Sequence, residues 1–135
     1  MARSINELSD LIRQTGFSLH TYLRSGHLEK VYQTGLANRL LKLGLDVKAN
    51  YPLHVFDEDG TLLGDYFADL FIEGLLIVEI KACKTLASEH MAQLLGYLRA
   101  SRVEHGLLIN FGPQKFEIRK FILPLAQDQS EMQEL

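Results

Sequence analysis

The chain has 135 residues, of which 47% are hydrophobic, and its formal net charge is -3. A chain of this length can build one domain with a real core but not two. The mild negative charge argues against a strongly basic nucleic-acid binder, whose affinity would come from many Lys and Arg contacts. Carboxylates gathered around a metal ion also lower the net charge, so the charge counts only weakly against a metal site.

Cysteine content and hydropathy bear on the location of the protein. Cys83 is the sole cysteine, so no internal disulfide can form, which fits a reducing cytoplasm. Residues 1–7 lack an apolar signal region. No apolar stretch approaches the roughly 20 residues that a membrane span needs. We therefore expect a cytoplasmic protein without a membrane partner.

Two amphipathic helices are expected in the first third of the chain. Ser4 and Glu7 form a capping-box pattern, after which apolar residues recur at helical spacing to about Leu23. A second apolar stripe begins near His27, and Gly44 is its expected stop signal.

The rest of the chain predicts five strands and one further helix. The strands are alternating or short apolar runs bounded by turn residues, and the last of them is expected to be an edge strand. Ser88 is the expected cap of the helix. The expected elements are strands at 45–56, 61–72 and 75–82 (the last two joined tightly at 73–74), a helix from about residue 88, and strands at 105–111 and 115–122.

This order predicts an α/β fold with a single mixed β-sheet flanked by helices. The helix between the third and fourth strands would make those two strands parallel, because such a crossover returns the chain to the same edge. We assign residues 1–125 to one domain and residues 126–135 to a polar, acidic tail, which we expect to fray.

Charged residues end the third strand, although this strand is otherwise the most hydrophobic. Glu79 and Lys81 lie at i and i+2, so they point to the same face. Asp69, on the preceding strand, shares parity with Phe67 and Phe71, and a hairpin would bring its carboxylate beside Glu79. Buried charges are costly unless they are paired or bind a metal. Two carboxylates with an adjacent ammonium group therefore predict a site for a hard divalent cation and a water-orienting Lys.

The spacing Asp69-x9-Glu79-x-Lys81 resembles the PD-(D/E)xK nuclease superfamily. This pattern is loose by itself, and a second motif sharpens it. Gln93-x-x-x-Tyr97 resembles the element that follows the Lys in the branch related to RecB-type exonucleases.

A third motif lies upstream, on the second expected helix. Gly26-x-x-Glu29-x-x-Tyr32 is similar to the signature of the small bacterial GxxExxY proteins. The resemblance covers roughly residues 5–122. From position alone, Glu29 is a solvated charge at a helix N-terminus, where the helix dipole favours a carboxylate. The resemblance instead implies that Glu29 approaches the metal from the side opposite the strands.

The resemblance implies a restriction-endonuclease-like core of order α-β-β-β-α-β, extended here by an N-terminal helix and a C-terminal strand. It also implies metal-dependent hydrolysis of phosphodiester bonds in nucleic acid. Asp69 and Glu79 would hold Mg²⁺ or Mn²⁺ with the carbonyl oxygen of Ile80, and Glu29 would complete the metal shell or serve a second ion.

The remaining implied roles concern water and substrate. Lys81 would position the attacking water and stabilise negative charge at the phosphate, while Gln93 and Tyr97 would orient the substrate or the groups around the metal. The expected partner is nucleic acid, DNA in preference to RNA, and a homodimer is compatible with the sequence.

Two alternatives stay open at this point. The protein could be a nucleic-acid-binding or partner-binding module that keeps a nuclease fold with little or no catalysis, because fold does not imply function. In the other alternative Lys81 neutralises Asp69 and Glu79 in a structural ion pair, and no metal binds.

Overall fold

A six-stranded sheet with helices on both faces makes up the computed structural model, which describes residues 2–125 and 131–135. The strand order is β1-β2-β3-β4-β5-β6, and β3 and β4 are parallel while the other neighbours are antiparallel. The predicted α/β class with one mixed sheet is therefore confirmed. The elements are α1 (Ile5–Leu23), α2 (Glu29–Lys42), β1 (Val47–Phe56), β2 (Leu62–Ile72), β3 (Leu76–Lys81), α3 (Ser88–Ser101), β4 (His105–Asn110), β5 (Glu117–Ile122) and β6 (Gln133–Glu134).

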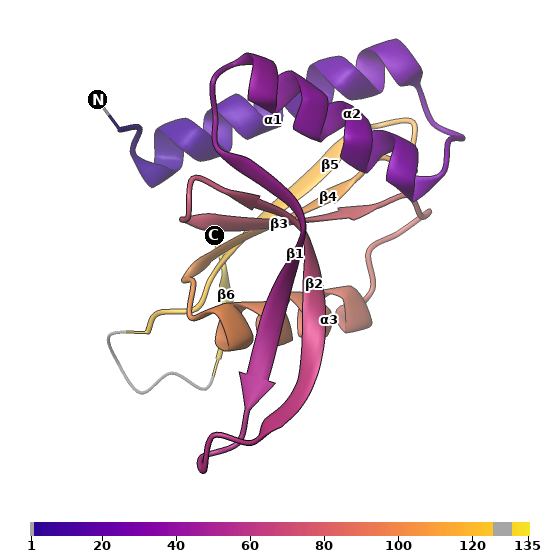
Figure 1. The fold of residues 1–135 in the computed structure, drawn as a ribbon. Helices are drawn as coiled ribbons and strands as arrows, with labels where there is room; N and C mark the ends of the chain where they lie inside the picture. The colour runs from indigo at the N-terminus through magenta and orange to yellow at the C-terminus, as the bar shows by residue number, and fades with distance from the viewer. Residues whose placement is uncertain (1, 126–130) are drawn as a thin grey trace.

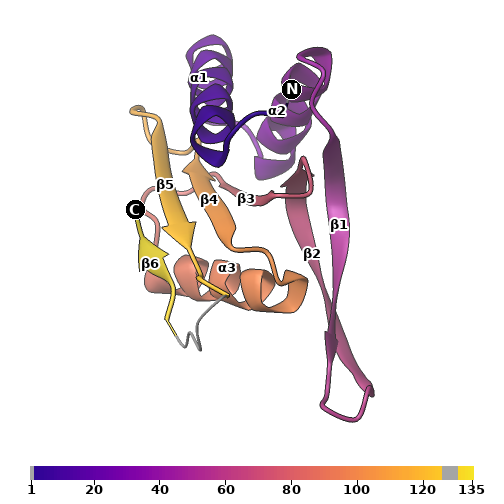
Figure 2. The same ribbon diagram turned by 90° about the vertical axis from the view of Figure 1, so that its left-hand side faces the viewer.

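The helices form two layers, with α1 and α2 over one face of the sheet and α3 over the other (Figures 1 and 2). The paired strands β1 and β2 extend beyond the rest of the sheet as a long ribbon (Figure 2). Within the described residues, none of the helices is both long and apolar enough to cross a membrane.

The start of each N-terminal helix follows from its local sequence. The Ser4 hydroxyl accepts the N–H of Glu7, and the Glu7 carboxylate accepts the N–H of Ser4, as the capping-box pattern predicts. The second helix begins at Glu29 and not near His27, because Leu28 takes an extended conformation with φ -67° and ψ 149°.

A hydrophobic cluster lies on each face of the sheet, and β3 contributes to both. Val78 and Ile80 pack beneath α1 and α2, whereas Ile77 packs against α3. All three side chains are fully buried. The predicted burial of β3 on both faces is thus confirmed. Glu79 and Lys81 continue the side of β3 that faces α3, because side chains alternate along a strand.

The β1–β2 ribbon changes face at its middle. Leu70 packs in the cluster beneath α1 and α2, but Ala68, two residues earlier, packs against α3. Opposite this step Asn50 has a φ of +51°, a left-handed conformation that Asn tolerates better than most residues. The expected parity of Asp69 with Phe67 is therefore wrong, and Phe67 is 57% exposed.

Two further local expectations are wrong. Ala87, not Ser88, is the N-cap of α3, and its N–H donates to Nδ1 of His90 at 2.9 Å. At the C-terminus, Gln133 and Glu134 pair with β5, so β5 is not an edge strand there and these two residues are not frayed. Residues 126–130 of the expected tail lie outside the described residues.

Candidate active site

Asp69 and Glu79 lie opposite each other where β2 and β3 part. The last paired residues of the two strands are Leu70 and Val78. Beyond them the Asp69 N–H donates to Oε2 of Glu79, and the Ile80 N–H donates to Oδ2 of Asp69, both at 2.8 Å. At this point of the ladder, each carboxylate accepts a backbone N–H that a carbonyl of the neighbouring strand would otherwise accept. One oxygen is used in this way, and the other oxygen of each carboxylate is left for a ligand.

A tight turn sets this register. Glu73 and Gly74 have φ angles of +56° and +66°, and the Leu75 N–H donates to the Ile72 carbonyl at 3.0 Å. Ile72 pairs with Leu76, so the connection between the two strands comprises residues 73–75. The expected tight connection is confirmed, and it places residue 69 beside residue 79.

Burial makes the carboxylate pair hard to ionise. Glu79 is 2% exposed, and this burial, then the charge of Asp69, raises its pKa to about 8. Burial also raises the pKa of Asp69, although the N–H of Ile80 and the charge of Lys81 oppose the rise. Two close carboxylates cannot both ionise cheaply without a cation between them. The pair of carboxylates is therefore suited to bind a cation.

Lys81 is held by α3 and not by the carboxylates. Its Nζ donates to Oε1 of Gln93 at 2.8 Å. Among the described residues, no ion pair joins Lys81 to Asp69 or Glu79. The structural ion pair of the second alternative is therefore not formed, and the Lys81 charge acts on the carboxylates from a distance.

Tyr97 lies one helical turn beyond Gln93 and shares its side of α3. Burial, then the charges of Glu79 and Asp69, raises the pKa of Tyr97 to about 12. Its ring contacts that of Tyr66, with centroids 5.2 Å apart. The phenol thus stays protonated near neutral pH and can donate a hydrogen bond, but it cannot serve as a base.

The Gly26–Glu29–Tyr32 motif divides into structural and exposed parts. Gly26 has a φ of +110° in the loop between α1 and α2. The Tyr32 hydroxyl donates to the Arg24 carbonyl and accepts the His27 N–H, while its buried ring stacks on Phe111 at 4.6 Å. Gly26 and Tyr32 therefore shape the loop that leads into α2.

Glu29 is the first residue of α2 and is exposed. Its charge contributes to the raised pKa of Glu79, so it lies on the same side of the molecule as the pair. Within the part of the chain that the structure describes, however, no three His, Cys, Asp or Glu residues are close enough to hold a metal ion. Ile80 presents its backbone to Asp69 while its side chain is buried beneath α1 and α2.

Gln33 and Asn50 were not singled out by sequence, yet they support the site. The Gln33 side chain is 6% exposed, and its Nε2 donates to Oδ1 of Asn50 and to the carbonyl of Asp69, both at 3.0 Å. These bonds fasten α2 to the point where the ribbon changes face. The only signal in the sequence is a Gln within the apolar stripe of α2, four residues after Glu29.

Replacing Gln33 with Leu is expected to lower the free energy of unfolding by about 1–3 kcal/mol, because a buried acceptor loses its donor. Divalent-cation affinity should fall as well, since the Asp69 backbone is no longer held. Gln33→Glu keeps the shape but puts a carboxylate against two acceptor oxygens, and should destabilise the fold at least as much as Gln33→Leu. Chemical denaturation and calorimetry measure both effects. An unchanged affinity in both variants would limit Gln33 to a role in stability.

Comparison with known proteins gives one family and one similar structure. The model of a family described as the PD-(D/E)XK nuclease superfamily matches residues 6–121. The solved structure of SSO0001 is 22% identical, with a TM-score of 0.58 over 87% of this chain and 60% of that chain. At this identity the likeness shows the fold alone, and the chain spans less than two thirds of its structural neighbour. No curated protein matches the chain.

Proposed function

Because the chain belongs to the PD-(D/E)XK nuclease superfamily, we propose that it hydrolyses phosphodiester bonds in nucleic acid with a divalent cation. The observation that carries the proposal is the buried pair of Asp69 and Glu79, with the pKa of Glu79 raised to about 8. A pair with only a structural role gains nothing from two carboxylates that resist ionisation. Within the superfamily, we propose a relationship to the GxxExxY proteins and the RecB-type branch, which the two helix motifs support.

The free oxygens of Asp69 and Glu79 are the ones that would hold Mg²⁺ or Mn²⁺. Hard cations prefer such oxygen ligands, and the Ile80 carbonyl and Glu29 are the further candidates. When bound, the cation supplies a Lewis acid that offsets phosphate charge and lowers the pKa of a coordinated water. Glu29 would have to move toward the pair, and it stands at the end of a helix beside a loop, where such movement is least restricted.

The other site residues act on the substrate. Lys81 has three N–H donors, and the bond to Gln93 uses one of them, so two remain for the attacking water and the phosphate. The bond to Gln93 holds the Lys81 amine on the side of the sheet that α3 covers. Tyr97, protonated near neutral pH, donates to a phosphate or to a group that holds the metal.

A second candidate function is a nucleic-acid-binding or partner-binding module with little or no catalysis. The observation that favours it is that the described residues hold no assembled set of three metal ligands. Calorimetry with Mg²⁺ and Mn²⁺ separates the two functions, because a binding module has no need for a cation at the carboxylate pair.

For either function we propose a cytoplasmic location. We also propose nucleic acid as the partner, DNA in preference to RNA, and a homodimer as the assembly.

The test of the proposed function is cleavage over a panel of labelled nucleic acids. Single-stranded and duplex DNA and RNA are incubated with the protein in Mg²⁺, in Mn²⁺ or in EDTA. We expect cleavage of at least one substrate with either cation and none in EDTA. Absence of cleavage from the whole panel, together with calorimetry that detects no cation binding, would overturn the proposal.

A further inference from the structure

A pocket of about 470 Å³ lies between α3 and the β1–β2 ribbon. Of the described residues that line it, none is acidic, although the chain as a whole has a net charge of -3. The lining combines aromatic rings with positive charge. Its principal residues are His54 and Phe56 from β1, Tyr66 from β2, Gly96 and Arg99 from α3, and Arg102 directly after that helix.

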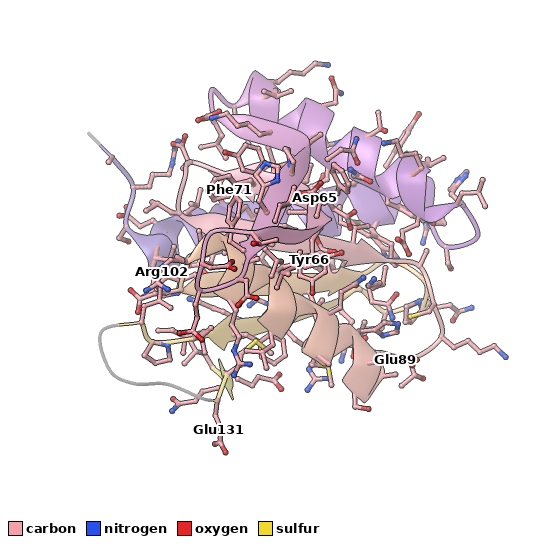
Figure 3. All side chains as sticks on the ribbon, turned by 60° about the horizontal axis from the view of Figure 1, so that its bottom comes forward. Asp65, Tyr66, Phe71, Glu89, Arg102 and Glu131 are labelled. Atoms are coloured by element: carbon pink, nitrogen blue, oxygen red, sulfur yellow. The ribbon has the colours of Figure 1, made fainter. Side chains whose placement is uncertain are left out.

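The pocket adjoins the carboxylate pair through a short chain of contacts. Tyr66 lines the pocket and packs against Tyr97, whose pKa is raised in part by the charges of Glu79 and Asp69. The Tyr66 ring packs against α3 at Gly96, where a Cβ would lie in ordinary contact with it at 3.8 Å. Figure 3 shows Tyr66 over the middle of α3 and Arg102 at the C-terminal end of that helix. One layer of side chains thus separates the pocket from the site.

The exposed faces of the lining residues suit an unpaired nucleotide. Tyr66 is 41% exposed and Phe56 is 59% exposed, so both rings present area to solvent at the pocket. Aromatic rings and guanidinium groups stack on nucleobases, and arginine also binds phosphate. In a duplex the base faces are covered by neighbouring pairs, so only an unpaired base can enter such a pocket.

We propose that this pocket binds one unpaired nucleotide of a single-stranded nucleic acid, next to the phosphodiester bond that is hydrolysed at the carboxylate pair. The base lies against Tyr66 and Phe56, and the phosphate contacts Arg102. Arg102 makes no ion pair in the described part of the chain, so its charge is available for a phosphate. The inference rests on the proposed function and names its substrate class.

The experiment measures binding without catalysis. Anisotropy of a short fluorescein-labelled oligothymidylate, a duplex of equal length and an oligouridylate is titrated with the full chain in EDTA. We expect the single strands to bind more tightly than the duplex. Tyr66→Ala should weaken single-strand binding about 5- to 150-fold, because a stacked base is lost. Tyr66→Phe keeps the ring and should bind like the wild type, as should Tyr22→Ala, which removes an exposed tyrosine of α1.

The second variant tests the phosphate contact. Arg102→Ala should lower the slope of log K against log salt by about 0.7, the value for one phosphate of a single strand. Arg3→Ala, an exposed arginine near the N-terminus, is the matched control and should leave the slope unchanged. Duplex binding as tight as single-strand binding, or equal affinities for Tyr66→Ala and Tyr22→Ala, would overturn the inference. An unchanged salt slope for Arg102→Ala would overturn the phosphate contact.

The two proposals fail in different ways. Binding in EDTA does not depend on hydrolysis, so a chain that binds single strands through Tyr66 but never cleaves them loses only the proposed function. A chain that cleaves with Mg²⁺ but binds equally well without the Tyr66 ring loses only the pocket.

Discussion

Replacement of Lys81 by Ala is expected to abolish cleavage while divalent-cation binding is kept or becomes tighter. The Lys81 charge lowers the pKa of both Asp69 and Glu79, so it also repels a cation placed between them. Removing it therefore favours metal binding. The rate should fall about 10²- to 10³-fold, the usual cost of losing one group that stabilises charge in the transition state.

Glu79→Gln is the matching change at the carboxylate pair, and it should abolish cleavage and weaken cation binding. Its side chain keeps the shape of Glu79 and an oxygen for the Asp69 N–H, but it removes one ligand charge. A unit charge at roughly 4 Å from the cation contributes ~4 kcal/mol at an effective dielectric constant of about 20. Metal affinity should therefore fall at least about a hundredfold.

Calorimetry and cleavage rates, measured on the same preparations, check both expectations. Lys84→Ala is the control for Lys81→Ala, since Lys84 is exposed and lies only three residues further along. Glu58→Gln, in the exposed turn between β1 and β2, is the control for Glu79→Gln. Metal binding that disappears in Lys81→Ala, or a Glu79→Gln protein whose response to metal is unchanged, would contradict the nuclease assignment.

The metal-free protein is expected to lose stability as the pH rises from about 5 to about 8. Burial, then the charge of Asp69, raises the pKa of Glu79 from 4.5 to about 8, so in this window the folded state holds a proton that the unfolded state has released. Stability from this group is complete below the unfolded pKa and is lost as the pH rises through the folded pKa. The slope is at most about 1.4 kcal/mol per pH unit. Asp69, whose pKa is also raised, acts in the same direction.

Divalent cation should reverse this loss. A cation that binds the folded state in place of the proton stabilises it by RT ln(1 + c/Kd), where c is the free cation concentration, so the melting temperature at pH 8 should rise with added Mg²⁺ or Mn²⁺. Thermal melts followed by circular dichroism, with and without EDTA, measure the effect.

Glu79→Gln tests whether the titration of Glu79 causes the loss of stability between about pH 5 and about pH 8. The variant should flatten the pH slope, and its metal-free melting temperature at pH 8 should be no lower than that of the wild type, because like-charge repulsion is gone. Glu58→Gln should keep the slope. A Glu79→Gln protein that melts lower at pH 8 and keeps the wild-type slope would show that the pair stabilises the fold in its ionised form.

The sequence by itself determined the order of the elements as far as β5 and brought Asp69, Glu79 and Lys81 together as a candidate site. A short apolar run rich in strand-forming residues that ends in Glu79 and Lys81 favours a buried strand, and side chains that alternate with a period of two then put both charges on one face. The turn at Glu73 and Gly74 is local, so a hairpin that brings Asp69 near Glu79 was also predictable, whereas the pairing of Ile72 with Leu76, which sets the two residues opposite each other, is seen only in the folded chain. The strand and the turn both depend on residues that are close together in the sequence, so the spacing of residue types is enough to predict them.

Only the tertiary structure decided how the rest of the chain meets that core. The face change at Asn50 and Asp69, the bonds from Gln33, and the pocket at Tyr66 join residues from distant elements. The strand at Gln133–Glu134 likewise exists because β5 offers it a partner, and a polar pair of residues carries no strand signal of its own. Residue spacing describes one element at a time, whereas these contacts depend on how the twist of the sheet brings separate elements together.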